Sequence, residues 1–176
     1  MRIWLAVATL TLTLTTAARA EVMDATPGGF QVRQSVEIAA PAARVWASLV
    51  QPALWWDPRH TWSGSAANLS LAAASGGCFC ERLPGGGSVL HMSTVHAAPN
   101  ARLTLFGALG PLQNTGAAGH LNILLSEKDG RTTVTLTYDV GGYMKGGLDT
   151  LAAPVDGVLG QQIQRLRAQV ETGKAG

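Results

Sequence analysis

The feature that most constrains the fold is the apolar pattern near the end of the chain, in residues 148–170. Apolar side chains recur there at intervals of three and four, which is the spacing of one face of an α-helix. They are Leu148, Leu151, Val155, Val158, Leu159, Ile163, Leu166 and Val170. Pro154 is expected to kink this helix or to begin its longer half. A helix with one apolar face must cover another layer, so the rest of the chain has to supply apolar surface.

That surface is predicted to be a sheet. Alternating segments place apolar side chains on one face and polar ones on the other, the two-residue period of a half-buried strand. The expected strands are residues 30–38, 78–83, 88–97, 102–106, 120–126 and 132–140. A helix after Pro41, ended by Pro52, separates the first two, and Asp129-Gly130 marks a hairpin between the last two. The sequence therefore predicts an α+β fold, a curved antiparallel sheet of about six strands around a long C-terminal helix.

Residues 1–20 have the organisation of a signal peptide. Arg2 precedes an uncharged apolar and threonine-rich stretch, and Ala18-Arg19-Ala20 gives the small-x-small pattern of a cleavage site. A retained membrane anchor is the alternative, but the stretch is shorter than the roughly 20 residues needed to span a bilayer. We expect an exported protein, periplasmic or secreted, with a flexible leader at 21–29 and a single domain at 30–172.

Charge and composition exclude several function classes. Removal of Arg2 and Arg19 with the signal lowers Lys plus Arg from 13 to 11, which equals the 11 Asp plus Glu. Such a neutral chain has no electrostatic footprint for nucleic acid, and no further apolar run predicts membrane insertion after signal removal. The glycine-rich segment 107–119 lacks the Lys-Ser/Thr ending of a phosphate-binding loop, so we predict a flap there and no cofactor.

Cys78 and Cys80 stand two residues apart in an expected strand. Their Cα atoms would lie roughly 6.5 Å apart, near the upper limit for a disulfide, and a mutual bond would strain the strand. If Leu83 pairs with Ser88, Cys80 faces His91 and the two thiols share a surface with an imidazole. Zinc uses such ligands, but a fourth is not evident, so no metal site is predicted. Whether the cysteines are free, oxidised or metal-bound stays open.

The same register sends Phe79, Glu81, Leu90 and Met92 to the opposite, inward face. A buried carboxylate has a raised pKa unless a partner reaches it, and this makes Glu81 the best candidate for a general base or a polar anchor. The alternative is a glutamate at the strand edge, exposed to water.

Several short motifs, taken in order, resemble one family. They are Ala40-Pro41 with Val45-Trp46, Leu54-Trp55-Trp56, Gly76-Gly77 with Phe79, Pro99 with Arg102-Leu103, and the Val158 to Leu166 helix. Together they resemble the START/Bet v 1-like (SRPBCC) helix-grip superfamily, in particular its branch related to the activator of Hsp90 ATPase. The resemblance implies a deep hydrophobic cavity between sheet and long helix, which members use for lipids, sterols, aromatic metabolites or polyketide intermediates.

The resemblance and the inward pattern together give a predicted ligand site. It comprises Trp55, Trp56, Phe79, Glu81, Met92, Leu105, Tyr138, Leu151, Val155 and Leu159. We expect a carrier or sensor of a small hydrophobic or aromatic molecule. The alternatives are a cyclase or dehydratase-like enzyme with Glu81 or Tyr138 as acid or base, and an interaction module if the tryptophans fill the space. The oligomeric state stays open.

Overall fold

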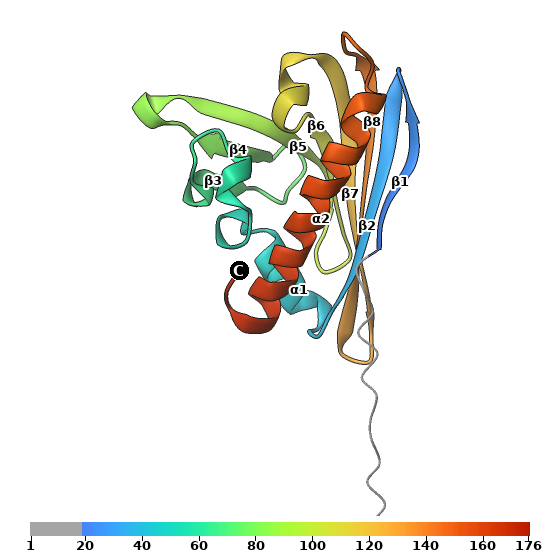
Figure 1. The fold of residues 1–176 in the computed structure, drawn as a ribbon. Helices are drawn as coiled ribbons and strands as arrows, with labels where there is room; N and C mark the ends of the chain where they lie inside the picture. The colour runs from blue at the N-terminus through green and yellow to red at the C-terminus, as the bar shows by residue number, and fades with distance from the viewer. Residues whose placement is uncertain (1–18) are drawn as a thin grey trace, which may run out of the picture.

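The computed structural model describes residues 19–176, so the predicted signal lies almost wholly outside the described residues. Residues 19–176 form eight strands and two α-helices, joined by short 3-10 turns (Figure 1). The strands are β1 (Arg19–Thr26), β2 (Gly29–Ile38), β3 (Leu69–Leu71), β4 (Cys78–Arg82), β5 (Ser88–Ala98), β6 (Arg102–Gly107), β7 (Gly116–Lys128) and β8 (Arg131–Tyr143). The helices are α1 (Ala42–Leu49) and α2 (Asp149–Thr172).

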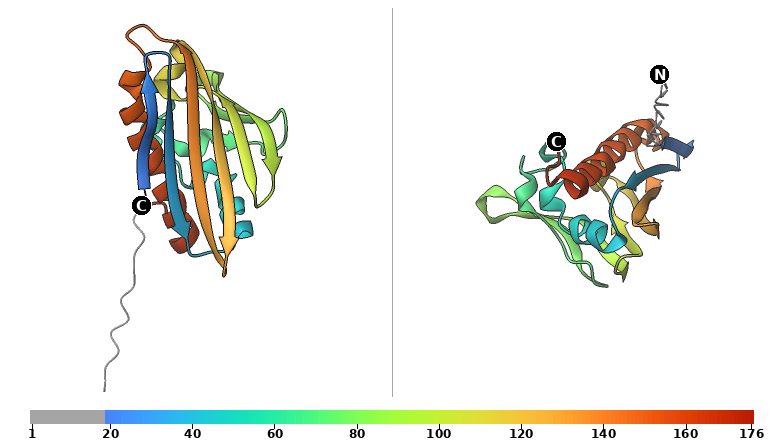
Figure 2. Two further views of the ribbon diagram at one scale, coloured as in Figure 1. Left: turned by 90° about the vertical axis from the view of Figure 1, so that its right-hand side faces the viewer. Right: turned by 90° about the horizontal axis from the view of Figure 1, so that it is seen from below.

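All eight strands belong to one antiparallel sheet in the order β1-β2-β8-β7-β6-β5-β4-β3. The sheet curves, and α2 lies across its concave side, while neither helix of the described part of the chain lies on the convex side (Figures 1 and 2). This confirms the predicted α+β helix-grip arrangement, with two strands more than expected. The apolar side chains that alternate along β2 and β8 face α2, and Val32 and Tyr138 are fully buried between the layers.

Helix α2 runs without interruption through Pro154. Its buried side chains are Ala152, Leu159, Gln162, Ile163, Leu166 and Val170, which confirms most of the predicted stripe. Leu148 precedes the helix and is also buried, and its backbone N–H donates to the carbonyl of Pro27 at 3.0 Å. None of the helices in residues 19–176 combines the length and apolar character needed to cross a bilayer.

Two strands were not predicted. The flexible leader expected at 21–29 is wrong, because β1 pairs with β2 from Arg19 to Thr26, with an irregularity between Val22 and Asp24. Its side chains from Glu21 onward are exposed, so an alternating apolar pattern is weak there. Strand β3 has only three residues, too few to show a period.

Helix α1 confirms the helix expected after Pro41, and its residues Val45 and Leu49 are buried. The loop that follows, residues 50–68, is named here the tryptophan loop. It contains 3-10 turns at Pro52–Leu54, Pro58–His60 and Ala66–Asn68 and leads into the edge strand β3. This loop covers the part of the sheet that α2 leaves free (Figure 1).

Candidate functional site

A small apolar cavity lies between the tryptophan loop and the sheet. Its volume is about 20 Å³, room for about one water molecule. Apolar side chains alone line it: Leu49, Pro52, Trp55, Trp56, Leu71, Phe79, Leu103, Leu105, Leu121 and Ile123. The deep hydrophobic cavity that the resemblance implies between the sheet and the long helix is not found in this part of residues 19–176, where Trp55 and Trp56 leave only this small space.

Three aromatic rings close this cavity as a continuous layer. The ring centroids of Trp55 and Trp56 are 5.4 Å apart, and Trp56 and Phe79 meet edge to face at the same distance. Both indole N–H groups donate to backbone carbonyls, Trp55 to Ser48 at 3.0 Å and Trp56 to His60 at 2.9 Å. The polar atoms of the indoles are thus satisfied within the loop, and their apolar rings face the sheet.

The predicted ligand residues fall into three groups. Trp55, Trp56, Phe79 and Leu105 line the cavity. Met92, Tyr138 and Leu159 are buried elsewhere in the core, and Leu151 and Val155 are half-buried on the first turns of α2. Glu81 lies beside the cavity without lining it.

Tyr138 is a poor acid or base where it lies. Its side chain is fully buried, and its hydroxyl donates to the carbonyl of Gly107 at 3.3 Å. Burial raises the pKa of Tyr138 to about 12, although the backbone of Leu109 opposes the shift. The phenol therefore stays protonated at neutral pH.

Glu81 points inward and is 1% exposed, so the alternative of a water-exposed glutamate is wrong. Its carboxylate accepts the backbone N–H groups of Trp62, at 3.1 Å, and Ser63, and lies 2.9 Å from Nε2 of His91. Burial raises the pKa of Glu81, but hydrogen bonds from Ser63, Trp62 and His91 outweigh it and hold the pKa below its usual value. Glu81 is therefore an ionised anchor of the tryptophan loop.

A bulge in the sheet brings His91 to Glu81. In the observed register Phe79 pairs with Met92 and Cys80 pairs with Leu90, which leaves His91 as an extra residue on β5. His91 turns to the inner face, and Leu90, expected there, is 58% exposed on the outer one. Sequence reasoning assumed regular alternation and so missed the pairing of His91 with Glu81.

The cysteines take the outer face of β4. Cys78 pairs with Ser93, and Cys78 and Cys80 form a disulfide whose Cα atoms are 5.4 Å apart. The two sulfurs and the imidazole of His91 therefore lie on opposite faces of the sheet. No cluster of three or more potential metal ligands occurs within residues 19–176.

Gln113, in the 3-10 turn of the predicted flap, extends this network. Its amide nitrogen donates to the carbonyl of Leu90 and lies 3.4 Å from Nδ1 of His91, while its carbonyl accepts the indole N–H of Trp62 at 2.7 Å. Burial lowers the pKa of His91, and the hydrogen bond with Glu81 opposes this only in part. His91 is thus neutral at pH 7, with Nε2–H donating to Glu81. We name Glu81, His91, Gln113, Trp62 and Ser63 the Glu81 clamp.

A surface groove adjoins the Glu81 clamp. It has a volume of about 530 Å³ and lies between β5 and the start of the flap. His91, Gln113, Leu90, Phe106 and Ala108 are among its lining residues. It is open to solvent on a face where exposed apolar groups gather.

A second carboxylate, Asp57, holds the other end of the tryptophan loop. It is 2% exposed and accepts hydrogen bonds from Arg59 and from the amide of Gln161 on α2, at 2.7 and 2.9 Å. The backbone N–H of Asp57 donates to Gln162 at 2.9 Å. The Arg59 guanidinium lowers the pKa of Asp57 to about 2, although burial opposes the shift. We name Asp57, Arg59, Gln161 and Gln162 the Asp57 clamp.

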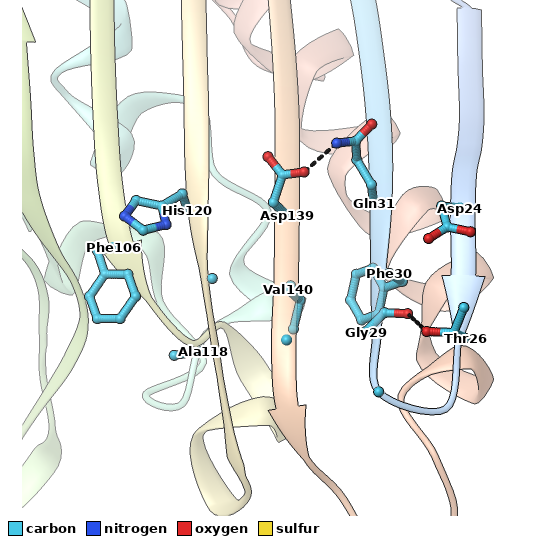
Figure 3. Close-up of a pocket in the computed structure, with 13 residues that line it drawn as sticks. Asp24, Thr26, Gly29, Phe30, Gln31, Phe106, Ala118, His120, Asp139 and Val140 are labelled. Carbon is cyan, nitrogen blue, oxygen red and sulfur yellow. Dashed lines mark hydrogen bonds between the residues drawn. The ribbon is translucent and has the colours of Figure 1, made fainter.

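A shallow groove of about 540 Å³ marks the convex face of the sheet (Figure 3). Phe106 and His120 pack together on one side of it, with ring centroids 4.8 Å apart. Gln31 donates to Asp139 on the other side. Small residues such as Ala118 form the floor of the groove. The groove exists because residues of β7 and β8 there have small side chains or are glycines.

Comparison with known proteins agrees with this architecture. Residues 29–171 match the family described as "Polyketide cyclase / dehydrase and lipid transport". No curated protein matches the chain. The fold is similar to CalU16 from Micromonospora echinospora, with a TM-score of 0.59 and 15% identity over 88% of this chain and 84% of that one. It is also similar to the Aha1 dimer from Colwellia psychrerythraea, with a TM-score of 0.57 and 17% identity over 82% of this chain and 98% of that one. These likenesses confirm the helix-grip resemblance at the level of the fold.

Proposed function

The chain belongs to the polyketide cyclase/dehydrase and lipid transport family, and from this premise we propose that it is an exported carrier of a small hydrophobic or aromatic molecule. The observation that carries the proposal is the lining of the cavity beneath Trp55 and Trp56, which is apolar throughout. Such a lining offers a ligand no hydrogen bond and favours an apolar group through the hydrophobic effect alone.

The ligand enters, in this proposal, by displacing the tryptophan loop. The cavity of about 20 Å³ is too small for any organic molecule, so Trp55 and Trp56 act as a lid that must move outward. The loop contributes no strand to the sheet before β3 and is held by the two clamps at Asp57 and Glu81. Opening it therefore leaves the sheet and α2 paired as they are.

Binding of the fluorescent probe N-phenyl-1-naphthylamine tests the carrier. We expect saturable probe fluorescence with wild type and a clear loss of it in Leu71→Phe, which adds bulk inside the lined space. The matched control is Leu54→Phe, the same change on an exposed side chain of the tryptophan loop. Equal binding by both variants, or no binding by wild type, contradicts a ligand site at this cavity.

Export is tested on the processed chain itself. Cleavage after Ala20 yields a protein that begins at Glu21, and β1 keeps its pairing with β2 from Glu21 to Thr26. The intact mass of protein recovered from the exported fraction of expressing cells is expected to match this start. An uncleaved chain retained inside the cell contradicts the proposal.

A second candidate function is supported by the Glu81–His91 pair. A buried carboxylate that fixes an imidazole tautomer leaves the other ring nitrogen, Nδ1, available as a general base. Gln113 covers this nitrogen from the groove side, so a substrate would have to displace the Gln113 amide. In this proposal the reaction is of the cyclase or dehydratase kind, with His91 as base and Glu81 as the residue that positions it.

Glu81→Gln separates the two functions. A carrier still binds the naphthylamine probe in this variant, because Glu81 does not line the cavity. For the enzyme, the base-catalysed ring opening of 5-nitrobenzisoxazole serves as a probe of His91. Its rate is expected to fall by at least the roughly 10²-fold typical of a misaligned general base, and His91→Gln should abolish the same rate. An unchanged rate in both variants excludes the enzymatic role.

A further inference from the structure

The Cys78–Cys80 disulfide cross-links residues two apart on one strand. A disulfide stabilises a protein chiefly by closing a loop in the unfolded chain, and its contribution shrinks as the loop shortens. This link closes one of the shortest loops that a disulfide can make, so it adds little to the stability of the fold. Both cysteines are half-buried on the outer face of the sheet, which carries no helix (Figure 2). The position of the disulfide therefore favours thiol–disulfide exchange over a structural cross-link.

The disulfide coincides with the bulge that places His91. Two residues of extended strand span about 6.7 Å, whereas the Cα atoms of Cys78 and Cys80 are 5.4 Å apart. The register of β4 against β5 shifts at this contraction, between Phe79 and Cys80. The residue left over on β5 is His91, which turns inward to lie 2.9 Å from Glu81. Regular pairing would instead set His91 opposite Cys80 on the outer face.

We propose that Cys78–Cys80 is a reversible redox site that exchanges with an external dithiol and whose oxidised form holds His91 against Glu81. A thiolate of the dithiol attacks one of the two sulfurs and breaks the Cys78–Cys80 bond, giving a mixed disulfide and one cysteine thiolate. The second thiol of the reagent then resolves the mixed disulfide. Two electrons and two protons pass to the protein, and the dithiol becomes a disulfide.

Reduction releases the contraction of β4. Cys78 and Cys80 can then separate to the spacing of an extended strand, and β4 pairs regularly with β5. His91 leaves Glu81, and Gln113 loses its contact with Nδ1. The redox state of the outer face thus controls the contacts of His91 with Glu81 and Gln113 on the inner one. This inference stands whether or not the cavity takes a ligand.

Thiol counting combined with NMR of His91 tests the proposal. The full chain is incubated without denaturant in buffers of reduced and oxidised dithiothreitol and is then alkylated. Its intact mass is measured by mass spectrometry. We expect two alkylated cysteines in the reduced sample, full reversal on reoxidation and an unchanged far-UV circular dichroism spectrum. In protein labelled with ¹⁵N-histidine, the Nε2–H signal of His91 is assigned with His91→Gln. This signal should disappear or shift on reduction.

The double variant C78S/C80S is the control. We expect its His91 signal to match that of reduced wild type and to stay unchanged when the reductant is added. If this variant does not fold, reduction of wild type decides the question alone. Two results overturn the proposal: thiols that become reactive only at denaturant concentrations that unfold the chain, or a reduced, folded protein whose His91 Nε2–H signal is unchanged.

Discussion

The two clamps hold the same loop with the same kind of group, yet they differ in what surrounds the carboxylate. Asp57 is balanced by Arg59, whose side chain is 73% exposed, so the Asp57 clamp is open to water on one side. Glu81 is balanced by backbone N–H groups and by His91, which is 6% exposed, so the carboxylate and its imidazole partner are enclosed. A lone charge costs far more in the second setting than in the first. Burial of the partners, more than the number of hydrogen bonds, therefore sets the cost of breaking each clamp.

Removal of the Glu81 carboxylate is expected to have the largest effect. Glu81→Ala leaves His91 and the N–H groups of Trp62 and Ser63 without an acceptor in a buried site. We expect the free energy of unfolding to fall by about 3–5 kcal/mol, because three donors lose their acceptor and each unsatisfied buried donor costs roughly 1–3 kcal/mol. Urea unfolding followed by circular dichroism measures it.

Glu81→Gln is the control for that loss. Its amide keeps one carbonyl acceptor, so we expect it to be less destabilised than Glu81→Ala by at least 1 kcal/mol, on the order of one hydrogen bond. Should Glu81→Ala cost no more than Asp57→Ala, burial would not be the deciding difference between the two clamps.

The Asp57 clamp is expected to show its contribution as a pH dependence. The pKa of Asp57 is about 2 in the folded chain against an ordinary 3.8, so its stabilisation is present above pH 4 and is lost as the pH falls through 2. The lowered pKa corresponds to about 2 kcal/mol, an upper bound because Arg59 is exposed. Wild type and Asp57→Asn, unfolded in urea at pH 6 and at pH 2, are expected to differ less at the lower pH. A difference that stays constant with pH would show that the ionised carboxylate contributes nothing.

The layers could be predicted from the sequence because many residues in each element follow the same periodic pattern of apolar and polar side chains. Val32 and Val36 on β2 and the alternation of β8 each indicate one covered face, and the stripe of α2 supplies the cover. The clamps could not be predicted in this way, because one depends on a bulge in β5 and the other on a loop without a periodic pattern. Nothing in Ser88–Ala98 marks the bulge, so regular alternation placed Leu90 where His91 lies. The one available signal was the Cys-x-Cys spacing, because in a regular strand it lies near the upper limit for a disulfide and the bond is easier to form in a contracted strand.

The contact between Trp62 and Gln113 is expected to give the smallest effect. Burial lowers the pKa of His91 below its ordinary 6.5, so the folded protein binds a proton at His91 less readily than the unfolded chain does. The stability that neutral His91 allows is therefore present above pH 6.5 and is lost as the pH falls toward the pKa of His91 in the folded protein. On protonation, Nδ1 of His91 gains a hydrogen that points at the amide nitrogen of Gln113, also a donor. The amide cannot turn over, because its oxygen accepts the indole N–H of Trp62 and its nitrogen donates to Leu90. Acid should therefore separate Gln113 from Trp62.

Trp62→Phe isolates this step. The phenyl ring keeps the backbone bond to Glu81 and loses only the indole hydrogen bond of a side chain that is 51% exposed. We expect the free energy of unfolding at pH 7 to fall by no more than about 1 kcal/mol, the worth of one solvent-exposed hydrogen bond. Tryptophan emission of wild type should shift to longer wavelength as the pH falls below 6.5, and Trp62→Phe should lack this shift. Persistence of the shift in Trp62→Phe would assign it to another tryptophan, such as Trp46, Trp55 or Trp56, and would contradict an acid-sensitive contact between Gln113 and Trp62.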